Sequence, residues 1–162
     1  MGMTRPALRT DGWHGPESTL ITSLPALAQN HTQNALRYTP SLLSACRLDN
    51  ISPAQVELWH TESSLGPLAT PRESVFLQLT IDCSEPGVLD MQPDFPEGQR
   101  RLLVVRVPCE HPDAPERKGF VRARGVRVEV VEEVAEGGVS WRVAEVVDVG
   151  GHYPRCMLDK AM

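Results

Sequence analysis

Four segments of this chain have the patterns of β-strands, and most of them alternate apolar and polar residues with a period of two, as a strand with one buried face does. They are residues 74–82, 101–107, 120–134 and 139–148. The second segment is apolar at nearly every position, which favours a central place in a sheet. Because the segments follow one another along the chain, we expect a single antiparallel meander.

A local signal competes with the first of these strands. Thr70-Pro71-Arg72-Glu73 has the form of a capping box with proline at the first helical position, which predicts a helix. The alternation that follows is longer and rich in β-branched residues, so we expect residues 74–82 to form a strand instead.

Turn chemistry suggests how the last two strands pair. Gly137-Gly138 predicts a tight two-residue hairpin. This turn would place Glu133 opposite Arg142 and Arg127 opposite Asp148 on one face. We expect the other face to be the core side, and it would collect Val128, Val130, Val134, Trp141, Val143 and Val147. Even-numbered positions directly after Gly125 are apolar, but those before it carry Arg122 and Arg124. This change of parity predicts a β-bulge or bend at Gly125.

The same register puts Glu145 on the core side, opposite Val130. A carboxylate buried among valines is costly unless it is paired. Two interpretations stay open: Glu145 lies at a solvated strand end, or it faces a polar-lined cavity with Arg122 and Arg124 as partners across it.

The remaining segments predict an α+β fold. Helical spacing and a Ser23 cap favour a helix over about 24–37, ended by Thr39-Pro40. Residues 41–73 are ambiguous, and 84–99 form a long loop rich in proline and glycine. A turn after Asp148 leads into a helix start at Arg155, shortly before the chain reaches Met162.

Length and composition bound the class of protein. A chain of 162 residues suits one domain, which we place at 20–162 after a mobile arm at 1–19. With 41% apolar residues, 23% charged residues and a net charge of −5, neither disorder nor nucleic-acid binding is expected. No secretory signal or membrane-spanning run is present, so we expect a soluble, cytoplasmic protein.

The cysteines and histidines predict no inorganic site. Four widely spaced cysteines fit neither a disulfide framework nor a zinc site, and no histidine pair has i, i+4 spacing. We therefore expect no metal and no cofactor.

Several short motifs, in their order along the chain, carry a family resemblance. The motifs are His31-Thr32-Gln33-Asn34, Tyr38-Thr39-Pro40-Ser41, Pro71-Arg72-Glu73-Ser74-Val75-Phe76, Lys118-Gly119-Phe120-Val121-Arg122-Ala123-Arg124, Trp141-Arg142-Val143-Ala144 and Asp148-Val149-Gly150-Gly151-His152-Tyr153-Pro154. With these motifs the chain resembles the fungal START-like family DUF3074 over roughly residues 24–158.

The resemblance implies a helix-grip fold, in which a curved antiparallel sheet holds a long C-terminal helix around a hydrophobic cavity. Such a cavity would take a lipid, sterol or polyketide-like molecule. This chain departs from the family by ending almost as soon as that helix begins. The sheet face would then be covered in part by the 24–37 helix or by a second copy of the chain in a homodimer.

Three functions compete under this resemblance. The leading hypothesis is a module that binds an apolar small molecule. The second is a cyclase or isomerase of a fungal secondary-metabolite pathway, in which Glu145 with Arg122 or Arg124 steers proton transfer. The third is a truncated remnant without a ligand, and whether any chemistry occurs stays open. The expected ligand contacts are Trp141, Val143, Val128, Val130, Leu77 and Leu79 as walls, with Glu145, Arg122 and Arg124 as polar groups.

Overall fold

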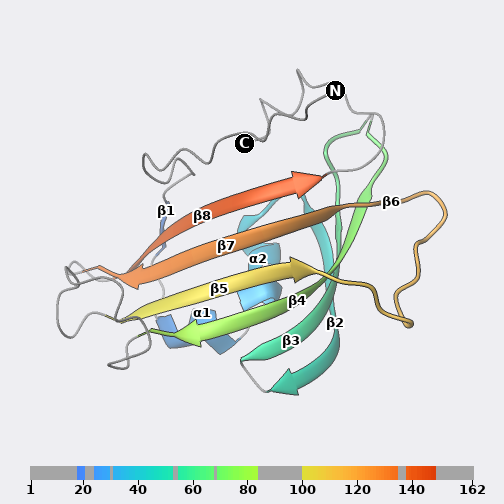
Figure 1. Cartoon of the computed structure of the whole chain (residues 1–162). Helices are drawn as coiled ribbons and strands as arrows, with labels where there is room; N and C mark the ends of the chain where they lie inside the picture. Colours follow the sequence, from blue (N-terminus) through green and yellow to red (C-terminus); the bar gives the residue numbers. More distant parts are fainter. Residues whose placement is uncertain are drawn as a thin grey trace, which may run out of the picture.

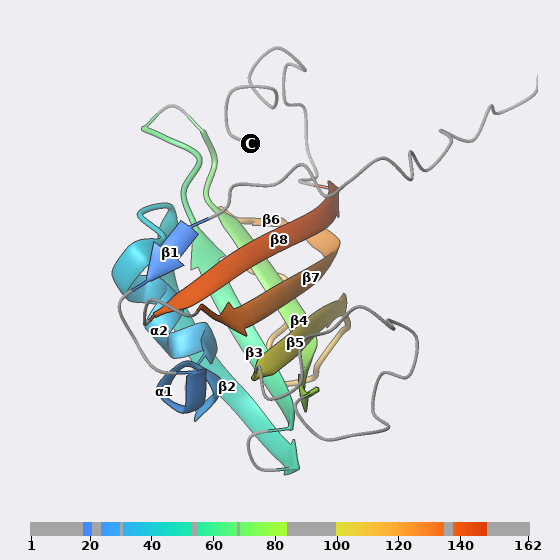
Figure 2. The ribbon, with the colours of Figure 1, turned by 90° about the vertical axis from the view of Figure 1, so that its left-hand side faces the viewer.

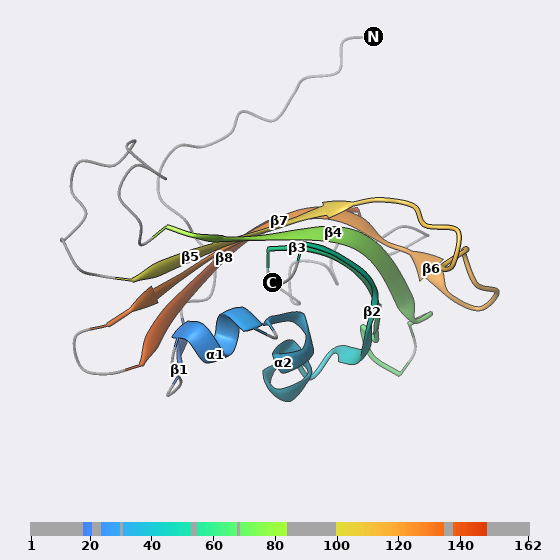
Figure 3. The ribbon, with the colours of Figure 1, turned by 90° about the horizontal axis from the view of Figure 1, so that it is seen from below.

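In a computed structural model, the described parts of the chain form a curved antiparallel sheet with two short helices against one side (Figures 1 and 3). The described residues are 18–20, 24–29, 31–52, 55–67, 69–83, 100–134 and 138–148. We call the side that carries the helices the concave face and the other side the convex face. The α+β class expected from the sequence is confirmed.

The sheet is ordered β1-β8-β7-β5-β4-β3-β2 (Figure 2), and each neighbouring pair is antiparallel. The strands are β1 (Ser18–Leu20), β2 (Leu42–Ser52), β3 (Val56–Ser63), β4 (Arg72–Asp82), β5 (Arg101–Pro108), β6 (Val121–Arg122), β7 (Arg124–Glu133) and β8 (Val139–Asp148). The helices are α1 (Leu24–Gln29) and α2 (His31–Tyr38). The short β6 lies off this path and pairs in parallel with the start of β4.

The predicted meander is confirmed, since β4, β5, β7 and β8 are successive neighbours in the sheet. The helix suggested by the Thr70 capping box does not form. Arg72 and Glu73, the last two residues of that box, already belong to β4. The nine alternating residues 74–82 outweigh a four-residue capping signal, because β4 pairs with β3 on one side and with β5 and β6 on the other.

The region that the sequence left ambiguous holds the hairpin β2–β3, whose register shifts at three places. The helix expected over 24–37 appears as α1 and α2, with Asn30 outside the described residues. Strand pairing already begins at Ser18, opposite Trp141. The C-terminal segment from Val149, the loop at 84–99 and residues 1–17 lie outside the described residues, so the predictions made for them stay predictions.

The interruption predicted at Gly125 lies two residues earlier. Ala123 separates β6 from β7 and donates its backbone N–H to the Glu73 carbonyl at 2.8 Å. From Arg124 onward β7 pairs with β8 residue by residue, so no bulge occurs at Gly125. The reversal in the apolar pattern instead marks the point where the chain leaves β4 and joins β8.

The predicted register of the last hairpin is wrong by three residues. Glu133 pairs with Val139, so five residues, 134–138, connect the strands in place of a two-residue turn. Arg127 therefore lies opposite Glu145, and Val130 opposite Arg142. A shift by an odd number exchanges the faces of one strand relative to the other. Val128 and Val130 consequently lie on the face opposite Trp141 and Val143.

Two apolar clusters stabilise the fold, one on each face of the sheet. On the concave face, Leu24 of α1 packs with Leu102, Val131 and Val139, joined by the less buried Ala28 and Trp141. On the convex face, Leu58 and Val75 pack with Ala114, which comes from the segment between β5 and β6. Neither described helix has the length and apolar run that a membrane-spanning helix requires.

Candidate functional site

A row of polar side chains crosses the concave face from one strand to the next. Each member is the cross-strand partner of the next, so their side chains point to the same side of the sheet. The row consists of Glu145 on β8, Arg127 on β7, Arg106 on β5, Gln78 on β4 and Glu57 on β3. We call it the polar row.

Glu129 lies next to this row and is the most enclosed charge of the described residues, with 0% of its side chain exposed. One carboxylate oxygen accepts the indole N–H of Trp141 at 2.7 Å and is hydrogen-bonded with His31 Nε2 at 2.9 Å. The other accepts Arg127 Nε at 2.9 Å and lies 3.2 Å from Arg106 Nη2. Both oxygens are therefore fully engaged.

Burial raises the pKa of Glu129, but the charge of Arg106, the contact with His31 and the charge of Arg127 together outweigh it. The net result is a pKa well below the ordinary value. Glu129 is thus ionised throughout the neutral range and fixes its four partners. A carboxylate held in this way is unsuited to accept or release a proton near pH 7.

Helix α2 is attached to Glu129 and to the polar row by two successive residues at its start. His31 contacts Glu129, and Thr32 donates its hydroxyl to Gln78 Oε1 at 2.5 Å. Arg106 donates to the same Gln78 oxygen at 3.1 Å. His31 also meets the ring of Trp141 edge to face, with ring centroids 6.0 Å apart. These contacts fix the position of α2 over the sheet.

Exposure along the polar row rises toward β8. Arg106 is 13% exposed, Arg127 is 28% exposed and Glu145 is 35% exposed. Val143, the cross-strand partner of Glu129, is half-buried on the same face, as is Trp141. The accessible part of the concave face therefore combines two apolar side chains with one ion pair.

The nine predicted ligand contacts do not form one site. Trp141, Val143 and Glu145 share the concave face, as expected. The register places four others on the convex face: Val128, Val130, Leu77 and Leu79. Leu77 packs there against the Leu58 cluster. These four residues are excluded from a concave binding site.

The arginines expected near Glu145 also lie elsewhere. Glu145 pairs with Arg127, whose Nη1 donates to it at 3.1 Å. Arg122 is buried and pairs with Glu73 at 3.1 Å, while the exposed Arg124 donates to Glu110 at 2.7 Å. The arrangement suggested for proton transfer, Glu145 with Arg122 or Arg124, is not formed.

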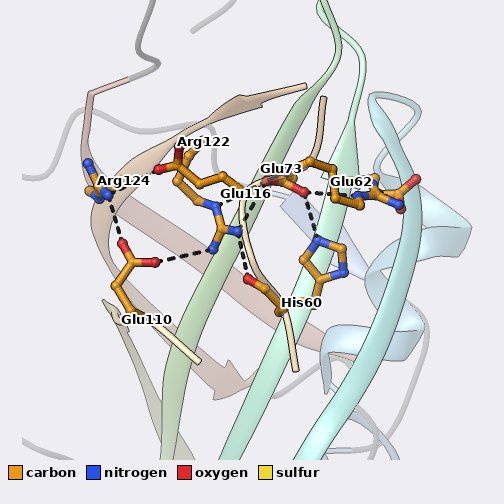
Figure 4. A network of polar contacts seen from close by, with 9 residues as sticks. His60, Glu62, Glu73, Glu110, Glu116, Arg122 and Arg124 are labelled. Atoms are coloured by element: carbon orange, nitrogen blue, oxygen red, sulfur yellow. Dashed lines mark hydrogen bonds and ion pairs between the residues drawn. The ribbon is translucent and has the colours of Figure 1, made fainter. Parts of the chain in front are cut away.

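Figure 4 shows the network that holds these two arginines, on the side of the sheet away from the helices. Glu73 is its centre, with 1% of its side chain exposed. Its carboxylate accepts the backbone N–H and Nε of Arg117, both at 3.1 Å, and lies 3.3 Å from His60 Nε2. Arg117 and Ala114 belong to residues 109–120, which we call the strap. The network fastens the strap to the convex face.

Periodicity and spacing did not identify the residues at the centre of the concave face. Glu129 stands between two valines in an alternating strand, the usual position of a solvent-facing charge. His31 and Thr32 entered only as part of a family motif. Apart from Arg127 on the same strand, the partners of Glu129 come from α2, β5 and β8, so no local pattern joins them. Among the described residues, no group of three or more His, Cys, Asp or Glu side chains could hold a metal ion.

Comparison with known families gives one match. The family model described as "Protein of unknown function (DUF3074)" matches residues 19–162. No curated protein matches the chain.

Solved structures show the same fold at low sequence identity. Human StAR-related lipid transfer protein 5 is 17% identical, with a TM-score of 0.66 over 89% of this chain and 64% of that one. The human StarD13 (DLC2) lipid transfer and protein localization domain is 15% identical, with a TM-score of 0.67 over 90% and 66%. Human STARD10 is 12% identical, with a TM-score of 0.63 over 83% and 49%. The chain thus spans less than two thirds of each structure, and the START-like fold is confirmed.

Proposed function

Because the chain belongs to the DUF3074 family and has a START-like fold, we propose that it binds an apolar small molecule, such as a lipid, sterol or polyketide-like compound, against the concave face. The observation that carries this proposal is the position of Trp141 and Val143. Both are half-buried on the concave face, beside the Glu129 carboxylate, whose two oxygens are both engaged. Two of the similar structures are named for lipid transfer, which supports the same class of ligand.

The chemistry of this face suits such a ligand. Small-molecule sites combine apolar walls with a few fixed polar groups. Here Trp141 and Val143 supply apolar surface, and the Arg127–Glu145 pair supplies an oriented polar contact. Since Glu129 holds Trp141 and Arg127 in place, little side-chain entropy is lost when a ligand binds.

Native mass spectrometry of the purified protein tests the proposal directly. We expect an apolar molecule to remain bound, and an environment-sensitive apolar dye to bind the emptied protein. A protein that retains no ligand and leaves the dye unaffected would instead support the hypothesis of a remnant without a ligand.

A matched pair of substitutions on one strand locates the site. Val143→Trp fills space on the concave face and should abolish dye binding. Val146→Trp introduces the same side chain three residues away on the convex face, where Val146 is 80% exposed, and should leave binding unchanged. Equal effects of the two substitutions would place the ligand elsewhere.

The expectation of a homodimer belongs to this proposal as well. Size-exclusion chromatography with light scattering gives the oligomeric state with and without the dye. A dimer that loses dye binding when it is diluted to monomers would mean that the second copy completes the binding surface. A monomer that binds the dye would mean that one chain is sufficient.

A further inference from the structure

The charges along the polar row limit the kind of ligand that could bind to the concave face. Near Trp141 and Val143, the row and the adjacent Glu129 together present two guanidinium groups, Arg106 and Arg127, and two carboxylates, Glu129 and Glu145. Every one of these groups is paired within the set: Arg127 bridges the two carboxylates, and Arg106 contacts Glu129. The four formal charges cancel.

The pair at the accessible end still has hydrogen-bonding capacity. Arg127 uses Nε for Glu129 and Nη1 for Glu145, and its Nη2 makes no hydrogen bond to any described residue. Glu145 accepts through one oxygen, while the other has no partner in the described part of the chain. A donor and an acceptor thus lie side by side on adjacent strands, next to Val143.

A charged head group fits this arrangement poorly. A carboxylate near Arg127 would also face Glu145, and a quaternary amine near Glu145 would also face Arg127. Either would add an uncompensated charge to a partly desolvated, neutral cluster, which is costly. A hydroxyl carries no charge and is both donor and acceptor, so it could accept from Arg127 and donate to Glu145 at once.

We propose that the ligand is an uncharged apolar molecule with a hydroxyl group, and that Arg127 and Glu145 select this group over an ionic one. The inference rests on the proposed function, because it requires that a ligand lies against the concave face.

Four probes with the same twelve-carbon chain test this selectivity: dodecane, dodecanol, dodecanoate and dodecyltrimethylammonium, measured by displacement of the apolar dye. The two uncharged probes are kept below their solubility limits and the two ions below their critical micelle concentrations. Dodecanol should bind about tenfold or more tightly than dodecane, since a hydrogen bond to a charged group is worth at least that factor. It should also bind more tightly than the two ions, whose charge the neutral cluster does not compensate. Equal binding of dodecanol and dodecanoate would overturn the inference and leave the proposed function intact.

A single substitution should change the preference in a stated direction. Glu145→Gln removes one negative charge, leaves the cluster with a net positive charge and should favour dodecanoate over dodecanol relative to the wild-type protein. Glu145 is 35% exposed, so this variant is expected to fold. Glu110→Gln removes an exposed carboxylate on the convex side and is the matched control, expected to keep the wild-type preference.

The outcomes separate the two proposals. If Glu145→Gln keeps the wild-type ratio of dodecanol to dodecanoate affinity, Glu145 does not contact the head group and the inference fails. If no probe displaces the dye from any variant, while native mass spectrometry finds no retained molecule, the proposed function itself fails.

Discussion

Trp141 donates its indole N–H to Glu129 diagonally across the β7–β8 pair, at 2.7 Å, although the direct cross-strand partner of Glu129 is Val143. The bond orients the large ring along the concave face and places its edge against His31. A tryptophan that packs beside Leu24 is thereby fixed by a buried charge as well as by apolar contacts.

Trp141→Phe isolates this hydrogen bond, because it removes the N–H donor and keeps an aromatic ring. We expect a loss of about 1.5–3 kcal/mol in unfolding free energy, the usual value for a hydrogen bond to a charged group. Trp141→Ala should lose more, about 3–5 kcal/mol, because the apolar contacts are lost too. Urea unfolding measures the loss of unfolding free energy in each variant. Equal losses would mean that the hydrogen bond accounts for the whole contribution of Trp141 to stability.

Glu129→Gln removes a buried charge without a change in size. Arg106 and Arg127 would lose their shared anion, so we expect destabilisation by about 3–5 kcal/mol in urea unfolding. Glu110→Gln, at an exposed ion pair, is the control and should show no measurable change. A fully stable Glu129→Gln variant would mean that the two arginines find other partners at no cost.

Acid should destabilise the protein through Glu73. Burial raises the pKa of Glu73, but the hydrogen bonds from Arg117 and the charge of Arg122 outweigh burial, so its pKa lies below the usual 4.5. A carboxyl whose pKa is lowered by folding adds stability above its unfolded pKa and loses it as the pH falls toward the folded value. The midpoint temperature of thermal unfolding should therefore be constant near neutral pH and fall below about pH 4.5.

Glu73→Gln checks the source of this acid sensitivity. The variant should be less stable at neutral pH and should lose less stability between pH 5 and pH 3 than the wild-type protein. An unchanged slope in that range would assign the acid sensitivity to other carboxylates, Glu129 among them.

Arg117→Ala should loosen the strap and leave the sheet intact. Arg117 donates to both Glu73 and Glu62 and lies over the ring of Phe120, with Cζ 4.1 Å from the ring centroid. Hydrogen exchange in residues 109–120 should accelerate severalfold, while exchange in β5 and β7 stays close to the wild-type rate. Accelerated exchange across the whole sheet would mean that the strap unfolds only together with the core.

The strands were predictable because the apolar pattern follows burial: β4 alternates, and the central β5 is apolar at nearly every position. The pairing of β7 with β8 was not, because Gly137-Gly138 is compatible with connections of different length. Because the predicted register differed by three residues, the prediction put Val128 and Val130 on the wrong face of the sheet. The hairpin β2–β3 gave no clear pattern, since Glu57 and Trp59 on one of its faces are both buried and form a hydrogen bond with each other.

The concave site was beyond sequence reasoning for a different physical reason. A buried charge is tolerated only when its partners surround it, and the residues around Glu129 are brought together by tertiary structure. His31 and Glu129 are separated by 98 positions. Only the family resemblance pointed to His31-Thr32, and it did so without assigning them a partner.

The attachment of α2 through His31 and Thr32 limits how this sequence can diverge. Hydrogen bonds specify direction as well as distance, so the helix cannot slide over the sheet in the way that a purely apolar contact would permit. A substitution at Gln78 or Glu129 would leave the start of α2 without its acceptor. Natural variants of this protein should therefore exchange residues 31, 32, 78 and 129 jointly, and covariation among these four positions would show that the docking of α2 has been preserved.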